Sequence, residues 1–177
     1  AAVARPAAPG NRQEGEALLF LQSDVVSSPI VMALRVKMED GISVIGAAFA
    51  DATNRHIGVA EYTENDLFSN SESLIIQLGV KECLVPADDA DYHLSKLRAL
   101  MERCGGVLTP VTRGTFTSKS IEEDMQRLLP ASQRAALAPE CSKKVAMSSA
   151  AALLSYLGLL SDESNFGRYT FCVVCTS

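Results

Sequence analysis

Ile30-Val-Met-Ala-Leu-Arg-Val-Lys-Met38 has the pattern of a β-strand, because apolar residues alternate with Arg and Lys in its second half. The segment Glu39-Asp-Gly41 follows, and an Asp-Gly pair favours the positive φ angles of a tight hairpin. The next segment, Ile42-Ser-Val-Ile-Gly-Ala-Ala-Phe-Ala50, is apolar on both faces, which is typical of a central strand. After a polar turn, a third strand is predicted at Ile57–Tyr62. These segments predict a three-stranded antiparallel meander.

Helical patterns begin after the meander. Ser69-Asn-Ser-Glu72 has the spacing of a capping box, which predicts a helix start held by the Ser69 hydroxyl and the Glu72 carboxylate. A short buried strand is expected at Glu82–Val85, before a proline. Apolar residues recur every three or four positions over Leu94–Cys104, which indicates a second helix. A fifth strand is predicted at Val107–Val111.

The remaining segments complete a mixed α/β order. A third helix begins after Ser118 or Ser120 and runs through Leu129, and a fourth contains Met147–Leu157. The small residues of the fourth helix favour close packing on a sheet over a coiled coil. The end of the chain, Tyr169–Val174, is expected to be extended. This order of elements predicts the α/β class with a ribonuclease H-like fold. The expected sheet is mixed and five-stranded, with the three-stranded antiparallel meander and two parallel strands, and helices cover both of its faces.

Length and charge limit the functions open to the chain. Its 177 residues suit one domain, assigned to residues 9–177, while residues 1–8 are an Ala/Pro segment expected to be a linker or domain boundary. Pro9-Gly-Asn11 resembles the entry to a short helix. The net charge is −5, and the closest approach to a basic cluster is the pair Lys143–Lys144. A protein that grips DNA by its phosphates needs a basic surface, so this composition argues against an independent nucleic-acid-binding module.

The cysteines and apolar runs exclude two further classes. The five cysteines are odd in number and scattered, which favours reduced thiols over a disulfide framework. Apolar runs are too short to span a bilayer, so no membrane association is expected. Cys172-Val-Val-Cys175 has a metal-ligand spacing, but a single such pair is weak evidence for zinc, and neither His56 nor His93 has a further ligand near it. No metal or cofactor is therefore assigned to this chain.

A metal-dependent nuclease of ribonuclease H-like fold is the alternative function. Such enzymes hold two metal ions between clustered carboxylates, one of them in the middle of the first strand. Here that position is occupied by Ala33-Leu-Arg-Val36, without an acid. The nearby acids Glu39, Asp40, Asp51 and Asp66 fall at strand ends or before a helix, where acids usually form turns and caps. The first interpretation is therefore a domain with no catalysis of its own.

Two blocks of sequence carry a family resemblance. The first is Asp66-Leu-Phe-Ser-Asn-Ser-Glu-Ser-Leu-Ile-Ile-Gln-Leu-Gly-Val-Lys-Glu-Cys-Leu-Val-Pro86. The second begins at Val145-Ala-Met-Ser-Ser149 and ends at Leu159-Leu-Ser-Asp-Glu-Ser-Asn-Phe-Gly167. Both resemble the connector domain, or domain II, of eukaryotic MutS homolog 2-type DNA mismatch repair proteins. The resemblance extends over about residues 9–169.

The resemblance implies a non-catalytic role. Connector domains of this family have a ribonuclease H-like fold and link the mismatch-binding domain to the core and ATPase. The full protein would act in the nucleus as a heterodimer with a second MutS homolog, and would contact mismatched DNA through other domains. ATP and magnesium would bind in a separate C-terminal domain, and this chain lacks a Gly-x-x-x-x-Gly-Lys-Ser/Thr loop.

The family also implies a docking surface for MutL-type partners. The corresponding helix here is Ser120-Ile-Glu-Glu-Asp-Met-Gln-Arg-Leu-Leu129. Its apolar residues share one face, which leaves Glu123, Asp124 and Arg127 largely outside it. A charged helix face is most often only solvated. The resemblance instead makes these three residues the candidate partner-docking site.

Overall fold

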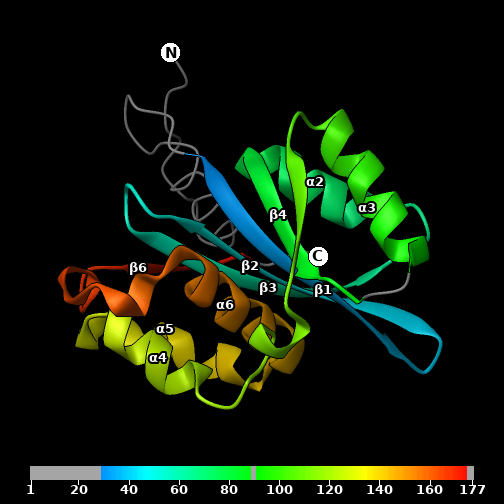
Figure 1. Cartoon of the computed structure of the whole chain (residues 1–177). Helices are drawn as coiled ribbons and strands as arrows, with labels where there is room; N and C mark the ends of the chain where they lie inside the picture. The colour runs from blue at the N-terminus through cyan, green and yellow to red at the C-terminus, as the bar shows by residue number, and fades with distance from the viewer. Residues whose placement is uncertain (1–28, 89–90, 175–177) are drawn as a thin grey trace, which may run out of the picture.

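The computed structural model describes residues 29–88 and 91–174. Within these ranges six strands form one mixed sheet in the order β5-β4-β1-β2-β3-β6 (Figure 1). The strands are β1 (Ile30–Glu39), β2 (Ile42–Asp51), β3 (His56–Glu64), β4 (Val80–Pro86), β5 (Val107–Val111) and β6 (Thr170–Val173). The expected linker, the helix after Asn11 and Cys175 lie outside the described residues.

The strand directions confirm the α/β class and the meander. Strands β1, β2 and β3 are antiparallel neighbours, while β4 runs parallel to β1 and β5 parallel to β4. The β1–β2 turn has positive φ at Asp40 (51°) and Gly41 (77°), as the Asp-Gly pair predicted. The expected strand at Glu82–Val85 lies inside β4, between β1 and β5.

The sheet has one strand more than the five predicted. Residues 170–173 pair parallel to residues 56–59 of β3, which makes β6 the edge strand beside β3. Four residues offer too few positions for an alternation pattern, so the sequence showed only an extended segment there.

Helices cover both faces of the sheet (Figure 1). Residues of α2 and α3 share one apolar core with the sheet, and residues of α4, α5 and α6 share the other. The α-helices are α2 (Ser69–Leu78), α3 (Asp91–Arg103), α4 (Ile121–Leu128), α5 (Arg134–Leu137) and α6 (Lys144–Leu157). Short 3-10 helices are η1 (Arg113–Thr115), η2 (Ala131–Gln133), η3 (Ala138–Ser142), η4 (Leu159–Ser161) and η5 (Glu163–Asn165). None of the described helices is long and apolar enough to cross a bilayer.

The start of α2 differs from the predicted capping box. The residue before the helix, Phe68, adopts a left-handed conformation (φ 55°) and makes no side-chain cap. The amides of Asn70 and Ser71 instead donate to the carboxylate of Glu64 at 3.1 and 2.7 Å. Glu72 is thereby left to pair with Arg103 of α3. The capping-box prediction was wrong because a carboxylate at the end of β3 occupies the helix start.

Helix α6 packs closely on the middle of the sheet. A Cβ atom on Gly46 of β2 would lie 2.2 Å from the carbonyl carbon of Val145, so only glycine allows this approach. Ser149 donates its hydroxyl to the Gly46 carbonyl oxygen at 2.7 Å. The buried small residues of α6, such as Ala146 and Ala150, confirm that this helix is core and not coiled coil.

Candidate functional site

Helix α4 carries the predicted docking residues on the outer surface of the α4–α6 layer. Ile121, Met125 and Leu128 are buried, as their spacing predicted. Glu123 and Arg127 are exposed and Asp124 is half-buried. The structure therefore confirms the direction of the apolar face and leaves the docking role of the other residues a prediction.

The rest of the chain holds α4 firmly at its C-terminal end. The amides of Gly167 and Tyr169, which precede β6, donate to the carbonyl oxygens of Arg127 and Leu128, each at 2.9 Å. At the N-terminal end, Ser120 makes no side-chain cap, contrary to the prediction of a serine cap there. The predicted docking residues thus lie on a helix whose C-terminal end is hydrogen-bonded to the segment before β6.

The charge order along α4 has a structural explanation of its own. Glu122, Glu123 and Asp124 occupy the first turn and Arg127 the last. Acids near the N-terminus and bases near the C-terminus interact favourably with the helix dipole. Among the described residues, Glu123, Asp124 and Arg127 form no ion pair. This order of charges therefore stabilises the helix itself, independently of any partner.

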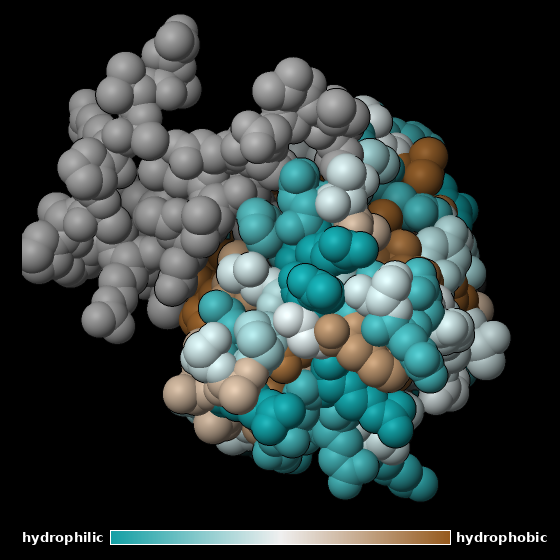
Figure 2. Space-filling model, turned by 90° about the vertical axis from the view of Figure 1, so that its left-hand side faces the viewer, coloured by the Kyte–Doolittle hydropathy of each residue, from teal (hydrophilic) through white to brown (hydrophobic). Residues whose placement is uncertain are grey.

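The surface around α4 is mainly polar. Figure 2 views the side of the molecule on which α4 and the segment before β6 lie, and it shows hydrophilic residues with small, separate hydrophobic groups. A surface of this kind suits a reversible contact guided by charge, because charged groups mainly set encounter rate and specificity.

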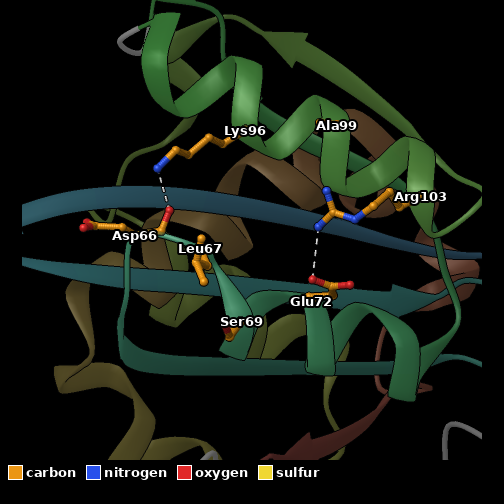
Figure 3. A pocket seen from close by; sticks show the side chains of 7 residues that line it. All are labelled: Asp66, Leu67, Ser69, Glu72, Lys96, Ala99 and Arg103. Carbon is orange, nitrogen blue, oxygen red and sulfur yellow. Dashed lines mark hydrogen bonds and ion pairs between the residues drawn. The ribbon is translucent and has the colours of Figure 1, made fainter.

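A shallow groove lies between α2 and α3 on the opposite face of the sheet. It measures about 370 Å³ and is lined by Asp66, Leu67, Ser69, Glu72, Lys96, Ala99 and Arg103 (Figure 3). Lys96 donates to the backbone oxygen of Asp66 at 2.6 Å, and Arg103 pairs with Glu72 at 3.1 Å. Leu67 lies between these two links and is 76% exposed. No pattern in the sequence indicates this groove, because it depends on how two helices pack side by side.

The acidic residues considered as metal ligands of a nuclease have other surroundings in the structure. The buried Asp51 carboxylate accepts hydrogen bonds from the backbone amides of Thr53 and Asn54 and from the Asn54 side chain, as expected of a turn former. Glu39 pairs with Lys37 at 3.3 Å, and Asp66 lines the groove. In residues 29–88 and 91–174 no group of three or more His, Cys, Asp or Glu side chains could hold a metal ion.

Cys83, Cys172 and His56 lie on strands of the sheet, and His93 lies on α3. Cys83 is fully buried in β4, and burial raises the pKa of its thiol to about 12. Cys172 is buried on β6. His93 packs edge-on against the ring of Phe68, with the centroids 6.1 Å apart, and His56 begins β3.

Comparison with known proteins places the chain in a family. The model of MutS domain II matches residues 29–170. The DNA mismatch repair protein msh-2 of Neurospora crassa is 42% identical over 172 residues, which cover 94% of this chain and 18% of that protein. The MSH2 proteins of Zea mays and Saccharomyces cerevisiae are each 35% identical, over 92% and 93% of this chain. The chain spans only 17–18% of the length of these relatives. It therefore belongs to the MutS domain II family, as the domain II of an MSH2-type DNA mismatch repair protein.

Proposed function

We propose that this chain is the non-catalytic connector of an MSH2-type mismatch repair protein and offers α4 to a MutL-type partner. The observation that carries the proposal is the family match over residues 29–170, which includes all of α4. In this role the chain links a mismatch-binding domain to the core and ATPase of the longer protein.

The other partners and the cofactors belong to the longer protein. A second MutS homolog would complete a heterodimer, mismatched DNA would contact other domains, and ATP with magnesium would bind outside this chain. The proposed location is the nucleus, where DNA repair takes place. The net charge of −5 supports the assignment of DNA contacts to other parts of the protein.

The geometry of α4 supports the docking part of the proposal. The helix is fixed by its buried face and by two backbone hydrogen bonds at its C-terminal end. Exposed charges on such a support make a preformed surface, which spares a partner the entropy cost of ordering it. Because the acids outnumber Arg127, we expect a basic patch on the partner.

The test is a double charge reversal, Glu123→Lys with Asp124→Lys, in the full-length heterodimer on mismatched DNA. Recruitment of the MutL-type partner should fall at least tenfold, an effect of about 1.4 kcal/mol. The free energy of unfolding should fall by about 1 kcal/mol or less per site, because both acids lie in the first turn and favour the helix dipole. Recruitment at the wild-type level would contradict the docking role.

A matched control separates a local from a general charge effect. Glu102→Lys makes the same change on an exposed glutamate of α3, on the opposite face of the sheet. That variant should recruit the partner normally. If Glu102→Lys impairs recruitment as strongly, the partner responds to net charge and not to α4.

A further inference from the structure

Strand β3 contacts helices on both faces of the sheet through neighbouring residues. Glu61 and Glu64 are three positions apart, so their side chains project from opposite faces. Glu61 reaches the first turn of α6, and Glu64 reaches the first turn of α2. Tyr62 also contacts α2. We name Glu61, Tyr62 and Glu64 the β3 clamp.

On the α6 face, the clamp caps the N-terminus of a helix that packs directly on the sheet. The Glu61 carboxylate accepts the amides of Val145 and Ala146 at 3.0 and 3.1 Å. Gly46, the direct neighbour of Glu61 in the β2–β3 register, accepts the hydroxyl of Ser149. Two adjacent strands thus hold the same two turns of α6, and the helix backbone lies so close to Gly46 that a Cβ there would clash with it.

On the α2 face, the clamp forms a chain of hydrogen bonds. Ser71 donates both its amide and its hydroxyl to the Glu64 carboxylate, each at 2.7 Å. The Ser71 hydroxyl has one hydrogen, so the 2.9 Å contact with Tyr62 must be donated by the Tyr62 hydroxyl. Burial raises the pKa of Tyr62, which keeps that hydroxyl protonated. Tyr62 and Glu64 together fix the first turn of α2.

We infer that the β3 clamp couples the positions of α2 and α6, so that displacing the start of one helix also displaces the start of the other through β3. The strand has little freedom of its own, because Glu61 and Glu64 face Gly46 and Ser43 in the ladder with β2. A one-residue slip would turn every side chain to the other face and release both helices at once. The segment between the two carboxylates therefore moves as one piece.

This inference deepens the connector role proposed above, on which it rests for its biological meaning. Helix α4 packs against α6, so the clamp joins the proposed docking layer to the α2–α3 layer across the sheet. The experiment below requires no partner protein. Failure of the clamp and failure of the docking proposal can therefore be distinguished.

The test is hydrogen exchange of the full chain, measured on peptides that cover each helix. Glu64→Ala should speed exchange at the start of α2 by about two- to thirtyfold, the effect of losing one helix cap. Coupling predicts a rise of at least twofold at the start of α6 as well. Glu61→Ala should produce the reciprocal pattern, and Glu64→Gln should restore part of the protection, because its amide oxygen can still accept.

A matched control removes a carboxylate that makes no cap. Glu72→Ala breaks the α2–α3 ion pair and leaves Glu64 in place, so α6 should keep its protection. Two outcomes would overturn the inference. In one, the faster exchange stays in the helix whose cap was removed. In the other, it rises equally in every strand, which indicates global destabilisation.

Discussion

Gly46 and Val145 approach so closely that one methyl group cannot be placed between them. A Cβ on Gly46 would lie 2.2 Å from the Val145 carbonyl carbon and 2.3 Å from the next backbone nitrogen. Both neighbours are backbone atoms of α6, so no side-chain rotation relieves the clash. The position of α6 on the sheet is therefore set by the absence of a side chain.

Gly46→Ala should destabilise the fold by about 3 kcal/mol, at the upper end of the usual cost of overpacking, because a whole helix must shift. Thermal or urea unfolding measures this change. Gly114→Ala is the control, since a Cβ there meets nothing within 4 Å. Equal stability of the two variants would show that α6 can move away from β2 without cost.

Val85→Asp should leave the domain largely unfolded at room temperature, so that no cooperative unfolding transition is observed. Val85 is fully buried in β4, and an unpaired charge there should cost roughly 4 kcal/mol or more. Val107→Asp makes the same change on the adjacent strand β5, where the side chain is 58% exposed, and should be nearly neutral. A wild-type melting curve for Val85→Asp would contradict the assignment of Val85 and β4 to the core.

Met125→Asp tests the face of α4 on which the docking proposal depends. Met125 is fully buried, so the variant should lose several kcal/mol of stability, by the same charge-burial argument. The neighbouring change Gln126→Asp should have a much smaller effect, because Gln126 is only half-buried. Circular dichroism melts compare the two. The opposite order would mean that α4 presents a different face to solvent.

Stability should fall in alkaline solution partly because of Cys83. Burial raises the pKa of its thiol from 9.0 to about 12, so below pH 9 the thiol is neutral in both the folded and the unfolded chain. Between pH 9 and 12 the unfolded thiol ionises and the folded one does not. Over that window the contribution of Cys83 to the free energy of unfolding is lost, by up to about 1.4 kcal/mol per pH unit. Cys83→Ala should show a shallower decline in urea unfolding between pH 8 and 11, and identical slopes would contradict the assignment.

Features encoded over many residues could be predicted from the sequence. The strands of the meander are long, and alternation and the Asp-Gly turn located them. The apolar spacing of Ile121, Met125 and Leu128 correctly predicted the buried face of α4. Repetition over several turns or positions averages out local exceptions.

Features that depend on one long-range contact could not be predicted. Ser69 and Glu72 have capping-box spacing, yet Glu64 from the preceding strand takes that place, and nothing local distinguishes the two arrangements. The α2–α3 groove depends on the pairing of Arg103 with Glu72, which are 31 residues apart. The docking role proposed for α4 rests on the family resemblance, because an exposed charged face has no pattern that separates a partner site from a solvated surface.

The position of β6 has a consequence for the growing chain on the ribosome. Thr170 pairs with His56, so the outer edge of β3 stays open until more than a hundred further residues have been synthesised. An open edge of this kind offers its backbone amides and carbonyls to any passing strand. A chain that terminates before Tyr169 would keep that edge open, and would lack the Tyr169 and Phe171 side chains of the core that Ile57 and Val59 share with α4–α6. Premature termination there should produce aggregation and degradation, and not a shortened but working domain.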